Sequence, residues 1–229
     1  MRDIPAAATG LRPILVTFAV PQEANPFRRM LPNTGPARVL ITGIGPERAR
    51  RALEVSLRDS LPAAVISGGF AGGLDPELLP GQVVCDTTDA PQFERGLRES
   101  GARPARFCSV PRILTTVTEK AALRNQTGAQ AVDMESELIR QLCRERQLPC
   151  GIVRVISDAA NQSLPLDFNL FLDRDGDLAW GRLLLALARR PGRIGPLIRL
   201  LATTRAAARR LAAVLAGCIT PVAAPPGPR

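Results

Sequence analysis

The sequence predicts one α/β domain in which helices cover a largely parallel β-sheet, followed by a basic helical extension. The first observation is a set of short apolar runs rich in valine and isoleucine, which are typical of buried strands. The runs span residues 14–20, 38–42, 63–67, 82–85 and 150–156. The second is the helical pattern between them, since strands that alternate with helices form parallel sheets with both faces covered. The third is length, because 229 residues, 45% of them hydrophobic, suffice for one core.

Two segments between these runs predict helices. Residues 46–60 open with Pro46, a residue type that is favoured in the first helical turn. Residues 133–147 carry apolar side chains at four-residue spacing, and Pro149 follows as a stop signal. These apolar positions are Met134, Leu138 and Leu142.

Residues 179–217 predict a helical extension in which apolar positions recur among arginines. The apolar positions are Leu183, Leu187, Ile194, Leu197 and Leu201. Pro191 and Pro196 predict that the extension forms at least two pieces. We therefore assign residues 1–178 to the main domain and residues 179–217 to an extension packed on it or on a membrane. Residues 218–229 are expected to form a tail without fixed structure.

The basic charge is confined to the C-terminal part of the chain. The formal net charge is +9, yet all 21 acidic residues lie at or before Asp177, and nine arginines follow it. Three interpretations are open: a solvated face on packed helices, an interfacial helix pair on anionic lipid, or a nucleic-acid-binding segment. The arginines are not interleaved with aromatic residues and the rest of the chain is formally neutral. We therefore expect no nucleic-acid partner.

The residue types that are missing narrow the chemistry. The chain has no histidine, which excludes Ser-His-Asp and Cys-His triads. Its five cysteines are odd in number and form no CxxC pair, so neither a disulfide framework nor a metal site is expected. Acid–base chemistry then falls to carboxylates, cysteine or the single lysine, Lys120.

Cofactor and targeting signals are missing as well. The segment 43–48 lacks the third glycine of a dinucleotide fingerprint, and there is no Walker A motif, so no cofactor is expected. No apolar stretch of about 18 residues and no signal-peptide pattern occur. The sequence therefore predicts a cytoplasmic location, with attachment to the periphery of the inner membrane as the alternative for the basic extension.

The segments that follow the predicted strands carry the candidate site residues. Ligands of open α/β sheets bind beyond the carboxyl ends of the strands, so residues just after each strand meet at one edge. In chain order, the segments at this edge contribute Glu23, the glycine turns 43–45 and 68–73, Met134 and Glu135 at the start of a helix, Ser157 and Asp158. Three carboxylates are thus expected beside two glycine-rich turns.

This set of residues suits glycosyl transfer from a nucleoside. The base leaves as the ribose develops oxocarbenium character, which calls for a proton donor at the leaving group and a base for the incoming water. Asp158 and Glu23 can divide these roles, and Glu135 can accept hydrogen bonds from ribose hydroxyls. Structural interpretations stand beside these: a turn or N-cap for Asp158, a solvated first-turn position for Glu23, an exposed helix position for Glu135 and core packing for Met134.

At these residues the chain resembles the superfamily of purine nucleoside phosphorylases and methylthioadenosine/adenosylhomocysteine nucleosidases. The matching segments are AVPQEA (19–24), GIGPERA (43–49), SGGFAGGLDPELLPGQVV (67–84), AVDMES (131–136) and VRVISDAAN (153–161). The resemblance implies a nucleoside-phosphorylase-like three-layer fold with a central mixed, twisted sheet. Together with an LPLDF segment and the arginine-rich residues 186–207, the chain looks most like the hopanoid-biosynthesis-associated members.

The resemblance implies a role for each matching residue. Asp158 corresponds to the acid that protonates N7 of the purine, and Glu23 to the carboxylate that activates water. Glu135 corresponds to the ribose ligand, and Met134 to the residue that packs beneath the sugar. The other implied substrate-binding residues are Phe70, Ala71, Gly72 and Ser157.

The implied reaction releases adenine from adenosylhopane, a triterpenoid attached at the 5' carbon of the nucleoside, and the implied assembly is a homo-oligomer. Methylthioadenosine and adenosylhomocysteine are the alternative substrates. Water is the favoured nucleophile over phosphate, because the first strand's loop supplies Glu23 where phosphorylases place an arginine. Phe70 in the glycine turn and the lack of a stacking aromatic in residues 115–130 depart from the family. These departures keep open a non-catalytic module of the same fold that binds membrane or nucleic acid.

Overall fold

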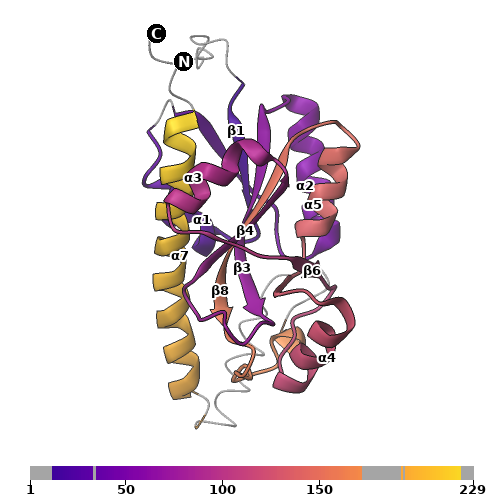
Figure 1. Cartoon of the computed structure of the whole chain (residues 1–229), viewed down its shortest axis with the longest axis vertical. Coiled ribbons are helices and arrows are strands. Elements are labelled where there is room, and N and C mark those ends of the chain that lie inside the picture. The colour runs from indigo at the N-terminus through magenta and orange to yellow at the C-terminus, as the bar shows by residue number, and fades with distance from the viewer. Residues whose placement is uncertain (1–11, 33–34, 172–191, 193, 223–229) are drawn as a thin grey trace.

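The computed structural model describes residues 12–32, 35–171, 192 and 194–222 and shows a sheet between two layers of helices (Figure 1). The strands are β1 (Ile14–Phe18), β2 (Ala37–Ile41), β3 (Ala64–Gly73), β4 (Val83–Asp89), β5 (Arg103–Pro104), β6 (Phe107–Ser109), β7 (Ala131–Asp133) and β8 (Cys150–Asp158). The α-helices are α1 (Pro21–Arg28), α2 (Pro46–Asp59), α3 (Glu94–Glu99), α4 (Val117–Thr127), α5 (Ser136–Arg144) and α7 (Ile194–Val222). Short 3-10 turns η1 (Pro91–Phe93) and η2 (Phe168–Phe171) complete the described elements.

The sheet is mixed rather than largely parallel. Its strand order is β2-β1-β3-β8-β4-β5, with β7 paired to β3 and β6 paired to β7. The neighbours β2, β1, β3 and β8 run parallel, whereas β4 runs antiparallel to β8 and β7 antiparallel to β3. Strand–helix alternation along the sequence does not show the direction of β4 or the existence of β7. The mixed sheet that the resemblance implied is confirmed.

Alternate residues of β1 supply the two layers of the core. Val16 and Phe18 pack in the cluster that includes side chains of α1, α3 and α7, while Leu15 packs with residues of α2 and α5. Figure 1 shows the same division, with α2 and α5 on one side of the sheet and α1, α3 and α7 on the other. A strand with both faces covered is apolar throughout, which is why its sequence shows a continuous run instead of an alternation.

Helix α7 is an integral part of the core. Leu211, Leu215 and Ile219 are buried in the same cluster as β1, so the helix stabilises the domain by packing on α1 and α3. The expected boundary after residue 217 falls inside this helix, which continues to Val222. Pro196 lies in its first turn, where a missing backbone N–H leaves no hydrogen bond unmade. The expected helical positions Leu183 and Leu187 lie outside the described residues.

No helix in the described ranges is both long and apolar enough to span a bilayer. Helix α7 does expose apolar side chains near its N-terminal end, namely Ile194, Ile198 and Leu201. Contact of this surface with a membrane stays a prediction.

Two local predictions were wrong. The glycine-rich segment 68–73 is not a turn, because its backbone continues β3 and pairs with β8 and β7. The helix expected from residue 133 begins at Ser136, since Asp133 belongs to β7 and Glu135 is the N-cap of α5. Met134 therefore lies between strand and helix, where its apolar side chain is free to face a pocket instead of the helix core.

Candidate active site

A pocket of about 280 Å³ opens at the carboxyl ends of the central parallel strands. All eight residues expected at the site line it: Glu23, Phe70, Ala71, Gly72, Met134, Glu135, Ser157 and Asp158. They come from four segments of the chain, which the parallel pairing of β1, β3 and β8 and the antiparallel pairing of β7 with β3 bring to one edge. The structure thus gathers the predicted residues, while their individual roles stay predictions.

Glu23 is held in the pocket wall by backbone amides alone. It lies in the first turn of α1 and is 5% exposed. Its Oε1 accepts a hydrogen bond from Phe70 N at 2.9 Å, and its Oε2 accepts from Ala19 N at 3.0 Å. Gly69 allows this approach, because a Cβ there would lie 3.1 Å from Glu23 Oε1 at a backbone φ of +153°. Burial raises the pKa of Glu23 above its ordinary value, although these amides and the charge of Arg154 oppose the rise.

Glu135 lines the same pocket from the N-cap position of α5. Its Oε1 accepts a hydrogen bond from Gly45 N at 2.8 Å, which links the loop after β2 to the start of α5. Burial raises the pKa of Glu135 to about 7, and the neighbouring carboxylate of Asp133 adds to the rise. Its carboxylate is therefore partly protonated near neutral pH.

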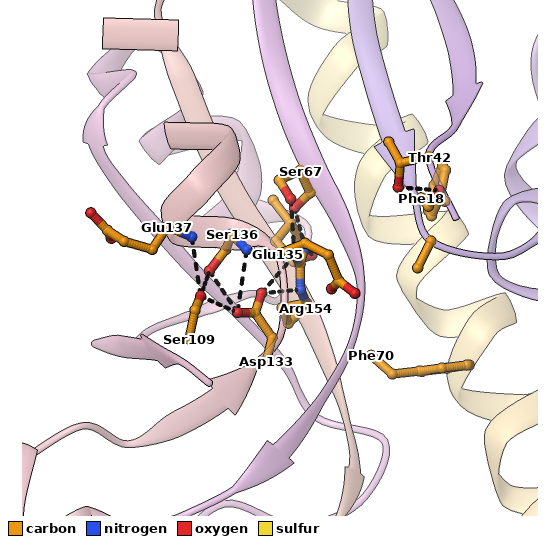
Figure 2. Close-up of polar contacts among 12 residues, drawn as sticks. Phe18, Thr42, Ser67, Phe70, Ser109, Asp133, Glu135, Ser136, Glu137 and Arg154 are labelled. Carbon is orange, nitrogen blue, oxygen red and sulfur yellow. Dashed lines mark hydrogen bonds and ion pairs between the residues drawn. The ribbon is translucent and has the colours of Figure 1, made fainter. Parts of the chain in front are cut away.

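The buried guanidinium of Arg154 links Asp133 to Ser67 beside the pocket (Figure 2). Arg154 is 2% exposed, and its Nη2 lies 2.6 Å from Asp133 Oδ2 and 2.9 Å from Ser67 Oγ. The other oxygen of Asp133 accepts hydrogen bonds from Ser109 Oγ at 2.6 Å and Ser136 Oγ at 2.8 Å. This buried ion pair joins β3, β7 and β8, and the charge of Arg154 lowers the pKa values of Glu23 and Glu135.

Asp158 lies at the end of β8 and is held by side chains. It is 5% exposed, and its Oδ2 forms an ion pair and hydrogen bond with Lys120 Nζ. Its Oδ1 accepts a hydrogen bond from Ser157 Oγ at 2.5 Å. Asp158 is therefore neither an exposed turn residue nor a helix N-cap, since the next described helical element, η2, begins only at Phe168.

Sequence reasoning missed several residues of the pocket. Phe168 lines it from η2, so an aromatic ring reaches the site from downstream of Asp158 rather than from residues 115–130. Leu200 and Thr204 line it from α7, which brings the basic extension to the site. Lys120 was noted as the only lysine, but its position in a weakly amphipathic helix gave no sign that it meets Asp158.

The described residues of the pocket are not arranged as a metal site or a phosphate site. In the described part of the chain, no group of three or more His, Cys, Asp or Glu is arranged to hold a metal ion. Among the described residues that line the pocket, Arg112 is the only basic one, and it pairs with Glu119 at 2.6 Å. Arg28 and Arg29 are exposed at the far end of α1. The described lining therefore resembles a site for a neutral nucleoside more than one for an anion.

Comparison with known proteins agrees with this geometry. Residues 87–187 match the model of the family described as "Phosphorylase superfamily". A 5'-methylthioadenosine/S-adenosylhomocysteine nucleosidase of Glaesserella parasuis is 30% identical over 167 residues, which cover 58% of this chain and 73% of that protein. The corresponding nucleosidase of Shewanella sediminis is 25% identical over 169 residues, covering 59% and 74%.

Solved structures share the fold. The Neisseria meningitidis nucleosidase of the same name, solved with methylthio-immucillin-A, has a TM-score of 0.70 at 19% identity and covers 92% of this chain and 100% of its own. The futalosine hydrolase of Helicobacter pylori has a TM-score of 0.69 at 13% identity, covering 91% and 97%. The α/β nucleoside-phosphorylase-like fold is thereby confirmed.

Proposed function

This chain belongs to the phosphorylase superfamily, within the family of 5'-methylthioadenosine/S-adenosylhomocysteine nucleosidase-like enzymes that cleave N-glycosidic bonds, and from this premise we propose that it hydrolyses 5'-substituted adenosines to adenine and the free sugar. The observation that carries the proposal is the meeting of Glu23, Glu135 and Asp158 in one pocket. Methylthioadenosine and adenosylhomocysteine are the first substrates to test, because the relatives' names support them over the larger adenosylhopane.

The proposed division of roles follows from the partners of each carboxylate. Asp158, against Lys120 and Ser157, donates a proton to N7, so that adenine departs as a neutral base. Glu135 accepts hydrogen bonds from the ribose hydroxyls and stabilises the positive charge that develops on the sugar. Glu23, whose raised pKa makes it a stronger base, takes the proton of the attacking water.

Water is the proposed nucleophile because the single basic residue among the described lining of the pocket, Arg112, is already paired with Glu119. The guanidinium of Arg154, whose charge acts on Glu23, is already bound by Asp133 and Ser67. Phosphate beside Glu23 would meet like charge, whereas water can donate to its carboxylate. Hydrolysis is therefore favoured over phosphorolysis.

A second substrate class has one observation in its favour. The pocket lining also includes apolar side chains, among them Leu164 and Leu200, and Leu200 lies on α7 next to the exposed Leu201. A long apolar 5' substituent could leave the pocket along this helix, as the adenosylhopane hypothesis requires. The arginines of α7 would then lie near the anionic surface of a membrane that holds such a lipid.

Product analysis tests the reaction and the substrate together. Purified full-length protein is incubated with methylthioadenosine, adenosylhomocysteine, adenosine and an adenosine carrying a long 5'-alkylthio chain, each with and without phosphate. We expect adenine and free sugar, independent of phosphate, with the highest kcat/KM for one of the 5'-thio nucleosides. A sugar 1-phosphate formed only with phosphate would show phosphorolysis instead. No adenine from any of the four would refute the proposed function.

A higher kcat/KM for the long-chain nucleoside than for methylthioadenosine would favour the second substrate class. The reverse ranking would favour the first.

A further inference from the structure

We propose that Lys120, acting through Asp158, is the source of the proton that leaves with the base. The proposal rests on the proposed function and adds to it a residue that lies behind the acid rather than in the pocket lining. Lys120 is 1% exposed and is the only lysine of the chain. Nothing in the resemblance assigns a role to this position.

The ammonium group of Lys120 is fully bonded. Its Nζ donates to Asp158 Oδ2, to Ala159 O at 2.7 Å and to Gln162 O at 2.8 Å. Three acceptors around one amine nitrogen match the three N–H donors of a protonated lysine, whereas a neutral amine has only two. The geometry therefore describes an ammonium–carboxylate pair, in which the transferable proton lies on Lys120.

Packing alone does not explain why a lysine occupies this buried position. It is the only buried residue of α4, the place where an amphipathic helix would normally bury a leucine or methionine. Burying an ion pair removes two charges from water, and an apolar side chain of similar volume is often at least as stabilising. Arg124 of the same helix pairs with Asp75 while its own side chain stays 39% exposed, so α4 does not need an internal charge to pack.

The position of the pair also fits proton delivery. Asp158 lines the pocket and is bonded on one oxygen by Lys120 and on the other by Ser157. In this resting state Asp158 is a carboxylate and has no proton to give. Of the two side chains bonded to Asp158, Lys120 is the one that can supply a proton, since the Ser157 hydroxyl is far too weak an acid to protonate a purine.

The proton balance of the step is simple. The proton moves from Lys120 Nζ to Asp158 Oδ2, which makes Asp158 a carboxylic acid, and then from Asp158 to N7. The electron pair of the C1'–N9 bond moves onto the base as that bond breaks. At the end the base is neutral, Asp158 is a carboxylate again and Lys120 is a neutral amine. Glu23 holds the proton of the attacking water, and solvent restores the ammonium after the products leave.

Two substrates with different leaving groups test the proposal. Adenine leaves poorly without protonation, whereas p-nitrophenolate leaves a p-nitrophenyl riboside without help from an acid. For Lys120→Met we expect kcat on methylthioadenosine to fall by about 10²-fold, the usual contribution of general-acid catalysis, while kcat on the p-nitrophenyl riboside falls less than about threefold. Asp158→Asn should show the same selective loss.

Arg124→Met is the matched control. It removes a cation from the same helix, one turn beyond Lys120, where the partner is Asp75 and not the acid. Both activities should stay within about twofold of the wild type, because the side chain of Arg124 is 39% exposed and ion pairs of exposed side chains contribute little.

Lys120→Arg tests whether the reaction needs the transferable proton of Lys120 or only its positive charge. Arginine keeps a cation against Asp158, which protects the fold if the neutral variant does not accumulate, but it does not release its proton. We expect the same selective loss on methylthioadenosine. Full activity of Lys120→Arg, or an equal loss on both substrates in either variant, would overturn the role of Lys120 alone. Inactivity of the wild type on both substrates would instead refute the proposed function.

Discussion

Two buried carboxylates of the pocket, Asp158 and Glu23, are equally exposed but have partners of different kinds. Asp158 is paired with a buried ammonium and a hydroxyl, whereas Glu23 has only backbone amides and a more distant guanidinium. Both residues are 5% exposed, so burial alone does not distinguish them. The difference in partners does, because an ammonium can supply a proton and a backbone amide cannot.

This contrast teaches how one fold obtains an acid and a base from the same residue type. The raised pKa of Glu23 results from burial that its amide partners do not fully offset, and it favours the uptake of a proton. The pair of Asp158 and Lys120, in contrast, holds a proton that it can donate. Pairs of carboxylates in different environments are the usual way in which enzymes divide acid and base roles at neutral pH.

The largest expected effect comes from removing the acid. Asp158→Asn should lower kcat/KM for methylthioadenosine by about 10³-fold, because the amide can accept no proton from Lys120 and hand none to N7. The release of adenine, followed by chromatography, measures this loss. Activity within tenfold of the wild type would contradict the different roles of Asp158 and Glu23.

A somewhat smaller effect is expected from removing the base, Glu23. Glu23→Gln removes the base for water but keeps a side-chain oxygen that can accept a hydrogen bond from the same backbone amides. We therefore expect kcat to fall by about 10²-fold with little change in substrate affinity. Turnover and equilibrium binding of methylthioadenosine measure the two quantities. If added phosphate restored turnover in this variant, the nucleophile would be phosphate, and the role given to Glu23 would be wrong.

The smallest effect concerns stability and sharpens the electrostatic side of the comparison. The pKa of Glu135 is raised to about 7 from 4.5, so its charged form costs stability above pH 7, and that cost disappears as the pH falls towards 4.5. Glu135→Gln should therefore raise the free energy of unfolding at pH 8 by at most about 3 kcal/mol and leave it nearly unchanged at pH 4.5. Urea unfolding at both pH values checks this. Destabilisation at pH 8 would mean that the bond from Gly45 outweighs burial.

The strands that carry the site could be predicted well, because each is a short apolar run in a sheet that is covered on both faces. Thus β1 begins at Ile14 and β8 at Cys150, where the apolar runs begin. The strands β5, β6 and β7 were missed, since each has only two or three residues and forms through pairing with distant segments. The SGGFAGG segment was assigned to a turn because glycine is rare in strands, yet here it lets Glu23 and Asp158 approach the backbone closely.

The sequence by itself determined which residue types can do the chemistry. A chain without histidine, with carboxylates just after its strands, has few other ways to move protons. Only the tertiary structure decided what stands behind each carboxylate, because Lys120 and Asp158 are 38 residues apart and meet through the packing of α4 against the end of β8. Local sequence patterns report which face of a helix is apolar, whereas the partner of one buried charge depends on the whole fold.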